Sequence, residues 1–339
     1  MLNTVYRLYA PRSFQPEIIE QPIEGKVVVR PTYLSICNAD QRYYQGLRSK
    51  EVLREKLPMA LIHEGIGVVA SDPTGTFSRG DRVVMLPNAP SEADSVIAEN
   101  YLRSSKFCGS GFDGFLQEAM VLPPERLVLL PEGIDPRVAA FTELVSVAVH
   151  AVLRFDGIAH ERRGTIGVWG DGNVGYIVSL VLRKMFPQSK IVVFGRSRAK
   201  LNDFTFVSET ALVDEDSLPE VDHAFECCGG EGSVQAIEQI IGRIRPEGTI
   251  SLLGVSENAV PVNTRMILEK GLRLYGSSRS GREDFLRTVR LFEENPEIAD
   301  YLQALVNEVR PIRSIADISA AFEADIRKPM GKTILKWEM

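Results

Sequence analysis

The chain has 339 residues, a length that accommodates two domains of ordinary size. It is 44% hydrophobic and 25% charged with a net charge of −6, values that are typical of a globular protein and argue against a nucleic-acid-binding or basic membrane-binding surface. The sequence has no apolar run of about 18 residues, no amino-terminal signal-peptide pattern and only four scattered cysteines, so we expect a cytoplasmic protein that binds neither nucleic acid nor membrane.

Short apolar runs separated by Pro, Gly and Asp dominate residues 1–142. Runs of this kind predict strands, and their close spacing predicts a mostly antiparallel β domain. The clearest predicted strands are residues 26–36 (KVVVRPTYLSI), 65–72 (GIGVVASD), 81–87 (DRVVMLP) and 117–131 (QEAMVLPPERLVLLP).

From residue 143 to 278 buried strands alternate with amphipathic helices. This alternation predicts a doubly wound parallel sheet of the Rossmann type, so the expected fold class is α/β with a second, β-rich domain. The predicted strands are 164–170, 190–195, 221–229, 248–254 and 272–278, and the predicted helices include 173–186 and 232–244. Residues 279–339 add a predicted helix at 281–295 and a closing strand, GKTILKW, at 331–337.

A glycine-rich turn, VWGDGNVGY, follows the first strand of the predicted Rossmann domain and opens its first helix. Gly170, Gly172 and Gly175 have the spacing of a dinucleotide-binding turn, and Asn173 and Val174 complete it. In such a turn the glycines let the backbone approach a pyrophosphate, which binds at the positive end of the helix. An ordinary strand-to-helix turn with chance glycines is the alternative.

The end of the second strand, KIVVFGRSRAK, indicates which dinucleotide is bound. An NAD site usually has an acidic residue there that binds the ribose 2′-hydroxyl, and this segment has none. Arg196, Ser197 and Arg198 instead offer donors to a 2′-phosphate, which favours NADP(H). The alternative is that these cations only form a solvated loop surface.

Five residues from three separate parts of the sequence suggest a metal site. Cys37 ends a strand and precedes Asp40, His63 is adjacent to Glu64, and Glu143 lies where the two predicted domains meet. Thiolate, imidazole and carboxylate donors together suit Zn²⁺, and Asp40 could orient a ligand. The alternative for His63 is a hydrogen-bonded core histidine.

These motifs together resemble the zinc-dependent medium-chain dehydrogenase/reductase family, which includes alcohol and sorbitol dehydrogenases. The segments CNAD, IHEGIG, TELVSVAVHA and GKTILKW carry the likeness, which covers the whole chain. The resemblance implies a GroES-like catalytic domain in residues 1–142, completed by residues 279–339 after the Rossmann insertion. It implies one catalytic zinc ion, held by Cys37, His63, Glu64 and Glu143.

Two departures from that family affect the chemistry. The region of its structural zinc contains only Cys108, so a second zinc is not expected. Ala39 stands where a relay hydroxyl is often found, which leaves Tyr43, Glu64 or a water chain as the proton donor.

Within the family, six segments are similar to the bacterial ribulose-5-phosphate reductase branch. They are CNADQRYYQG, LPMALIHEG, WGDGNVGYI, HAFECCGG, LLGVSE and GSSRSG. The resemblance implies NADPH-dependent reduction of the pentulose phosphate D-ribulose 5-phosphate to D-ribitol 5-phosphate, the precursor of CDP-ribitol for teichoic acid or capsule. It also implies a homodimer and a cytidylyltransferase as pathway partner. Arg42 and Arg279 are candidate ligands of the substrate phosphate, although exposed arginines are usually only solvated.

Two other functions are compatible with the sequence. A zinc-dependent NAD(P) polyol dehydrogenase acting on an unphosphorylated substrate would depend little on a substrate phosphate and would show little preference for the 2′-phosphorylated cofactor. A nucleotide-binding protein without catalysis would bind no metal at Cys37 and His63.

Overall fold

The computed structural model describes residues 1–339 and divides into two compact units. One unit comprises Met1–Ser146 with Ser280–Met339, and the other comprises Val147–Arg279. The sequence analysis placed the two divisions after residues 142 and 278. In the structure the first division falls after Ser146, within the helix α4 (Thr142–Ile158). The predicted α/β fold class is confirmed. None of the helices combines the length and apolarity needed to cross a lipid bilayer.

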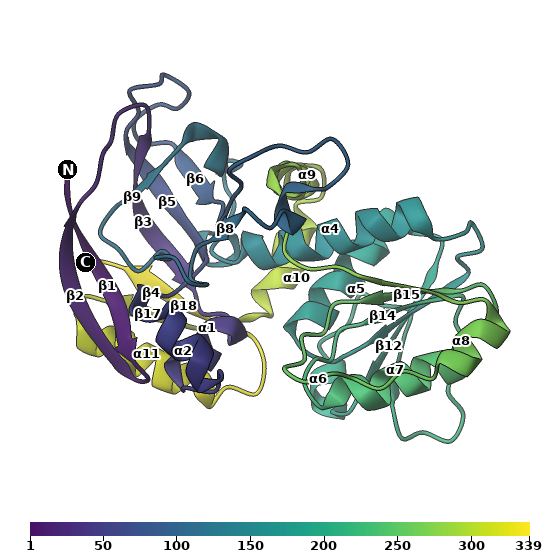
Figure 1. The fold of residues 1–339 in the computed structure, drawn as a ribbon. Helices are drawn as coiled ribbons and strands as arrows, with labels where there is room; N and C mark the ends of the chain where they lie inside the picture. The colour runs from purple at the N-terminus through teal and green to yellow at the C-terminus, as the bar shows by residue number, and fades with distance from the viewer. The chain divides into compact units, whose positions relative to one another are not determined.

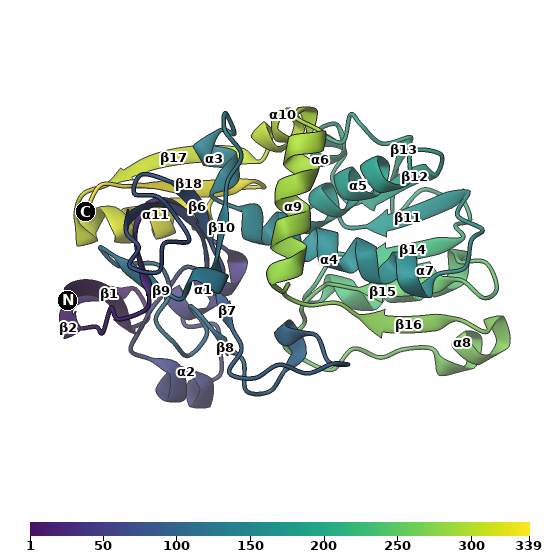
Figure 2. The ribbon, with the colours of Figure 1, turned by 90° about the horizontal axis from the view of Figure 1, so that it is seen from above.

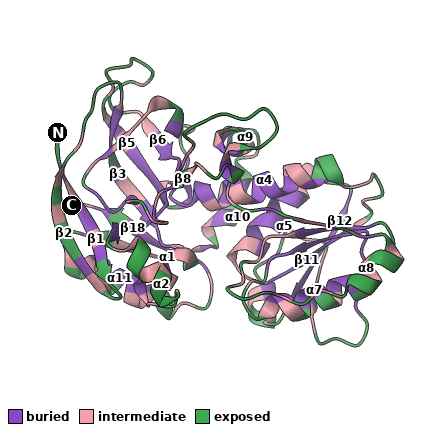
Figure 3. Cartoon of the chain, in the orientation of Figure 1, coloured by how far each residue is buried: buried purple, intermediate pink, exposed green.

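The first unit is built on a seven-stranded sheet in the order β10-β6-β5-β3-β18-β17, with β9 also paired to β3 (Figures 1 and 3). Only β17 and β18 run parallel. A smaller sheet, β2-β1-β4, and a short pair, β7-β8, complete the unit. The strands are β1 (Leu2–Ala10), β2 (Ser13–Glu20), β3 (Val27–Ser35), β4 (Met59–Ala60), β5 (Glu64–Ser71), β6 (Arg82–Met85), β7 (Asn88–Ala89), β8 (Lys106–Phe107), β9 (Met120–Leu122), β10 (Leu127–Leu129), β17 (Val306–Ile312) and β18 (Lys332–Trp337).

Short helices cover this unit, and α11 contributes to its core. Phe322 of α11 lies 4.7 Å from the Tyr44 ring and 5.3 Å from the Phe14 ring, measured between centroids, so the carboxyl-terminal segment and the amino-terminal strands share one hydrophobic core. The helices are α1 (Asn38–Tyr44), α2 (Lys50–Lys56), α3 (Pro136–Ala139), α9 (Arg282–Glu294), α10 (Glu297–Gln303) and α11 (Ile315–Ile326).

The second unit is a six-stranded, wholly parallel sheet in the order β13-β12-β11-β14-β15-β16. Chain order proceeds outward from β11 in one direction and then from β14 in the other, so α5 and α7 cover opposite faces (Figures 1 and 2). The place where the order reverses is where open α/β sheets bind ligands. The elements are β11 (Thr165–Trp169), α5 (Asn173–Met185), β12 (Lys190–Gly195), α6 (Arg198–Leu201), β13 (Glu209–Leu212), β14 (His223–Glu226), α7 (Gly232–Arg243), β15 (Thr249–Leu252), α8 (Thr264–Lys270) and β16 (Arg273–Gly276).

A buried histidine should make the stability of the second unit depend on pH. His223 is fully buried, its Nδ1 accepts a hydrogen bond from the Thr249 amide, and its ring lies 4.3 Å from that of His160. Burial, and then the charge of His160, lower the pKa of His223 to about 4. Between pH 6.5 and 4 the unfolded chain therefore binds more protons than the folded one, so stability is lost as the pH falls. We expect the free energy of unfolding to drop by roughly 1–2 kcal/mol from pH 7 to pH 5 on this account.

Urea unfolding of a Trp337→Phe variant, in which Trp169 of the second unit is the remaining tryptophan, measures this loss. In the same background, His223→Gln should remove this drop in the free energy of unfolding between pH 7 and pH 5. An unchanged slope in the His223→Gln protein would contradict the assignment.

Candidate metal centre and dinucleotide pocket

The strand register of the seven-stranded sheet brings three distant parts of the chain to one place. Ser35, the last residue of β3, pairs with Glu64 at the start of β5 on one side and with Ile334 near the start of β18 on the other. The residues just beyond the end of β3 and just before β5 therefore meet. Those residues include Cys37 and His63.

The side chains of Cys37, His63 and Glu64 offer sulfur, nitrogen and oxygen atoms that all lie within 4.8 Å of one another. His63 and Glu64 are buried, and His63 Nδ1 and Glu64 Oε2 have no hydrogen-bond partner. Buried polar atoms are rarely left unpaired without a reason, and this donor set fits Zn²⁺. Glu143, the fourth predicted ligand, is buried at the start of α4 but is not a member of this group.

The charges of these residues are strongly coupled in the metal-free protein. Burial lowers the pKa of His63, but the negative charges of Asp40 and Cys37 outweigh it and raise the pKa well above its ordinary value. Burial raises the pKa of Glu143 to about 7, with His63 acting in the opposite direction and Glu64 adding to the rise. A metal ion at the three-residue group would replace the imidazole proton, because only neutral histidine coordinates metals.

Asp40 fixes the backbone beside both predicted ligands. One carboxylate oxygen accepts from the Cys37 amide at 3.0 Å, the other accepts from the Ile62 amide at 2.9 Å, and the latter lies 3.6 Å from His63 Nδ1. Ile62 has φ of 74°, a left-handed conformation that is unfavourable for a β-branched residue. The surrounding hydrogen bonds therefore hold a strained turn directly before the histidine, as is common at functional sites.

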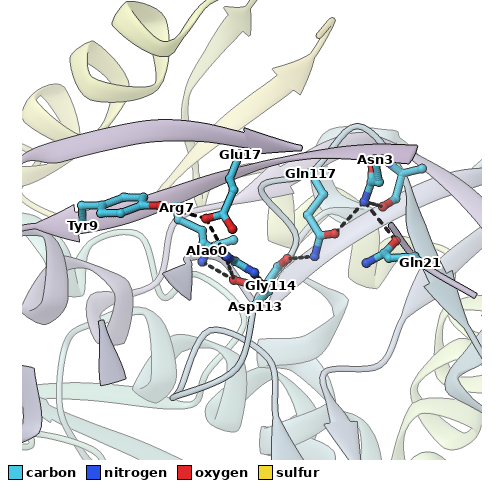
Figure 4. A network of polar contacts seen from close by, with 10 residues as sticks. Asn3, Arg7, Tyr9, Glu17, Gln21, Ala60, Asp113, Gly114 and Gln117 are labelled. Atoms are coloured by element: carbon cyan, nitrogen blue, oxygen red, sulfur yellow. Dashed lines mark hydrogen bonds and ion pairs between the residues drawn. The ribbon is translucent and has the colours of Figure 1, made fainter. Parts of the chain in front are cut away.

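The first strand also supports this turn (Figure 4). The Arg7 guanidinium binds both oxygens of Asp113, whose Oδ1 accepts from the Ala60 amide at 2.9 Å. Gly114 then donates its amide to the Ala60 carbonyl at 2.8 Å, and a Cβ at Gly114 would lie 2.2 Å from the Ile62 carbonyl oxygen. Only glycine lets the two segments approach so closely.

Lys332, the first residue of β18, is a buried partner of the metal group that the sequence analysis missed. Its Nζ lies 2.8 Å from Glu64 Oε1, and the two side chains are 2% and 0% exposed. Burial lowers the pKa of Lys332, but Glu64 and Cys37 outweigh it and raise the pKa overall. The lysine thus compensates negative charge at the metal group.

Three other predicted residues lie outside the ligand group. Tyr43 packs in the core of the first unit with the Arg48 guanidinium 5.1 Å from its ring centroid. Arg42 is half-buried on α1. Arg279 belongs to the second unit, so the structure does not place it relative to the metal group. The catalytic role of Tyr43 and the phosphate-binding roles of the arginines remain predictions.

The second unit has a pocket of about 490 Å³ at the carboxyl ends of β11, β12 and β14. The residues of the glycine-rich turn that line it are Gly170, Asp171 and Gly172. Gly175 lies outside the lining, and a Cβ there would lie 1.9 Å from the Gly170 carbonyl oxygen, so glycine is required for α5 to begin so close to the turn. The remaining lining residues are Trp169, Phe194, Gly195, Arg196, Lys200, Val213, Asp214, Cys227, Cys228, Gly229, Gly232, Gln235, Ala236 and Gln239.

The other predicted cofactor ligands have different surroundings. Asn173 and Val174 begin α5 without lining the pocket, and Ser197 caps α6 by accepting from the Lys200 amide. Arg198 forms an ion pair with Glu215 at 2.7 Å and is likewise not among the lining residues. Arg196 does line the pocket, together with Lys200 of the same segment.

A buried carboxylate shapes one wall of this pocket. Glu226, at the end of β14, accepts from the amides of Cys228, Gly229 and Gly254 at 2.9, 3.1 and 3.0 Å. The Ser233 hydroxyl donates to it as well, at 3.0 Å. All four partners are donors, so Glu226 holds together the loops that follow β14 and β15.

Comparisons with known proteins agree with this architecture. Residues 23–132 match the alcohol dehydrogenase GroES-like domain. The chain is 56% identical to ribulose-5-phosphate reductase of Bacillus spizizenii, with 100% of both chains covered. The chain belongs to the medium-chain dehydrogenase/reductase family. The resemblance seen in the sequence motifs is thereby confirmed.

Two further members of this dehydrogenase family extend the comparison. Ribulose-5-phosphate reductase 1 of Staphylococcus aureus is 51% identical over 100% of both chains. The crystal structure of S. aureus TarJ in complex with NADPH superimposes with a TM-score of 0.90 at 47% identity, again over 100% of both chains.

Proposed function

We propose that this protein is a zinc-dependent reductase that converts D-ribulose 5-phosphate to D-ribitol 5-phosphate with NADPH, supplying CDP-ribitol for teichoic acid or capsule synthesis. The observation that carries the proposal is full-length identity of 45–56% to four proteins named as ribulose-5-phosphate reductases. The Cys37, His63 and Glu64 group supports the metal requirement. The cations of the dinucleotide pocket support the phosphorylated cofactor.

The chain's residues divide the work of such a reduction between the two units. When bound, zinc supplies Lewis acidity at the ketone oxygen and NADPH supplies a hydride to the ketone carbon. Cys37, His63 and Glu64 would hold the metal, while Asp40 keeps their backbone in place. The glycine-rich turn and the amino end of α5, a helix of 13 residues, would bind the pyrophosphate.

Several finer assignments belong to this proposal. Glu143 would act as a further metal ligand, and Arg42 and Arg279 would bind the substrate phosphate. A proton must reach the new hydroxyl, and Tyr43, Glu64 or a water chain would deliver it in the absence of a hydroxyl at Ala39. Asn173, Val174, Ser197 and Arg198 would complete the cofactor site around the residues that line the pocket.

Oxidation of NADPH, followed at its nicotinamide absorbance, tests the proposed reaction. The expected result is turnover with ribulose 5-phosphate, little turnover with ribulose, and loss of activity after treatment with a chelator. Equal rates with ribulose and with NADH would favour the polyol dehydrogenase alternative. Absence of zinc from the purified protein together with absence of turnover would favour a binding protein without catalysis.

Replacing Glu226 by glutamine should weaken NADPH binding. Both oxygens of the Glu226 carboxylate accept hydrogen bonds from backbone amides. The NH2 group of the introduced glutamine would face one of these amides, donor against donor, and would displace one of the two loops at the pocket wall. We expect the dissociation constant for NADPH to rise about tenfold, with kcat much less affected. Nicotinamide fluorescence measures the binding, and Glu231→Gln, an exposed carboxylate before α7, is the matched control. Equal effects of the two substitutions would contradict the role given to Glu226.

We also infer a cytoplasmic homodimer. All four cysteines are free thiols, as suits a reducing compartment. β16 is an edge strand of the parallel sheet, and Val255 and Leu268 of the same unit are 56% and 80% exposed, so a second copy could cover this edge. Light scattering of the purified protein measures its oligomeric state. A cytidylyltransferase would consume the product, and co-purification would test whether the two enzymes associate.

A further inference from the structure

Asp171, the residue between the first two glycines of the turn, is bonded to the end of the neighbouring strand. Its Oδ2 accepts hydrogen bonds from the amides of Arg196 and Ser197, both at 2.8 Å. The carboxylate therefore connects the loop after β11 to the loop after β12. Both loops line the dinucleotide pocket.

The Asp171 side chain also occupies the space beside Gly195. A Cβ at Gly195 would lie 2.7 Å from Asp171 Cβ and 2.9 Å from Asp171 Oδ2, closer than side chains approach. The backbone of Gly195 does not have a positive φ, so lack of space is the reason for glycine there. Gly195 ends β12, which is where NAD sites carry the acidic residue that binds the ribose 2′-hydroxyl. Asp171 and such an acidic residue therefore exclude one another.

The loop that Asp171 holds carries the pocket's cations. Arg196 and Lys200 line the pocket, and neither side chain has an ion-pair partner in the structure. Arg198, between them, is paired with Glu215. Because both amides bound by Asp171 belong to the residues that begin this loop, the carboxylate fixes where Arg196 leaves the strand.

We propose that Asp171 is a positioning residue that sets the preference for the 2′-phosphorylated cofactor. It holds the Arg196 loop in place for the phosphate, and its side chain excludes the strand-end carboxylate that would favour NADH. This inference rests on the proposed NADPH dependence and adds the residue that enforces it.

A simpler view of Asp171 predicts the opposite change in NADPH affinity when the residue is replaced. If its negative charge only repelled a 2′-phosphate, any neutral residue at 171 would tighten NADPH binding. If it positions the loop, Asp171→Asn should stay within about threefold of the wild type, because the amide oxygen can still accept from both backbone amides. Asp171→Ala should instead weaken NADPH about tenfold, and NADH far less.

Binding of NADPH and NADH to the full-length protein, measured by nicotinamide fluorescence, separates these views. Asp216→Ala is the matched control and should leave both affinities unchanged, because Asp216 is an exposed carboxylate of the same unit that does not line the pocket. Tighter NADPH binding by Asp171→Ala, or an unchanged ratio of the two affinities, overturns the inference.

A second experiment tests the shared space. Gly195→Asp should be poorly tolerated beside Asp171 and also in the Asp171→Ala background, because alanine keeps the colliding Cβ. Of the three atoms nearest to a Cβ at 195, glycine at 171 would leave Leu201 Cδ2, at 2.9 Å, which is the movable end of a side chain. The Asp171→Gly, Gly195→Asp double variant should therefore recover thermal stability and bind NADH at least about tenfold better than NADPH.

The outcomes distinguish this inference from the function on which it rests. A wild-type protein that binds NADH as well as NADPH removes both the proposed cofactor and this role of Asp171. A wild type that prefers NADPH, with Asp171→Ala keeping that preference, removes only the role of Asp171. If Gly195→Asp is equally stable with aspartate, alanine or glycine at position 171, Asp171 does not exclude a carboxylate at the end of β12.

Discussion

Cys37→Ser should lower kcat/KM for NADPH-dependent ketose reduction by at least about a thousandfold, equivalent to roughly 4 kcal/mol of transition-state stabilisation. Serine is a far weaker zinc ligand than thiolate, so the three-donor group with His63 and Glu64 would lose its soft donor. Binding of NADPH should be unchanged, because the dinucleotide pocket lies in the other unit. Steady-state kinetics, zinc content by elemental analysis and nicotinamide fluorescence measure the three effects.

Cys108→Ser is the matched control for this loss. Burial raises the pKa of the Cys108 thiol to about 12, and the residue is close enough for the charge of His63 to act on it, yet it is not in the ligand group. We expect Cys108→Ser to keep its zinc and most of its activity. Comparable losses in both variants, or full turnover by the metal-stripped wild type, would disprove the role given to Cys37.

Local patterns in the sequence predicted the Rossmann unit well. Five of the six parallel strands were predicted from their apolar runs, and the glycine-rich turn lies between a strand and a helix as expected. The sixth, β13, was not predicted, because its sequence ETAL is short and contains no apolar run. In the first unit the patterns were weaker. The helices α1 and α2 are each 7 residues long and were not predicted, because helices so short depend on tertiary contacts such as those of Gln41 with α11.

The metal group could be predicted only in part. Cys37, His63 and Glu64 were found through residue type and family motifs, whereas Lys332 lies 268 residues from Glu64 and its position depends on the pairing of β18 with β3. A lysine that opens an apolar closing strand was the available signal. Asp171 was hidden for a related reason, since its partners Arg196 and Ser197 are brought to it by the pairing of β11 with β12.

Three side chains from different elements of the first unit hold the metal group in place. Asp40 holds the backbone before and at the ligands, Arg7 holds the turn through Asp113, and Lys332 balances the charge of Glu64. These supports come from α1, β1 and β18, so they are complete only when the carboxyl-terminal segment has joined the sheet. The contact between Lys332 and Glu64 is a buried ion pair, so it should also be important for folding.

Lys332→Met should destabilise the first unit by about 3–5 kcal/mol in the metal-free protein, because it leaves the Glu64 carboxylate buried without its partner. Adding Glu64→Gln should recover much of that loss, since the pair is then replaced by neutral groups of similar size. Urea unfolding in a Trp169→Phe background, with Trp337 of β18 as the remaining tryptophan, reports on this unit.

Lys336→Met tests whether burial is the cause. Lys336 lies on the same strand and pairs with Glu338 at 2.6 Å, but its side chain is 48% exposed. Solvent screens such a pair, so its loss should destabilise the unit far less than the loss of Lys332. Two results would show that an unpaired buried charge is not what destabilises Lys332→Met. One is an equal loss of stability in Lys332→Met and Lys336→Met. The other is a Lys332→Met, Glu64→Gln double variant that is no more stable than Lys332→Met alone.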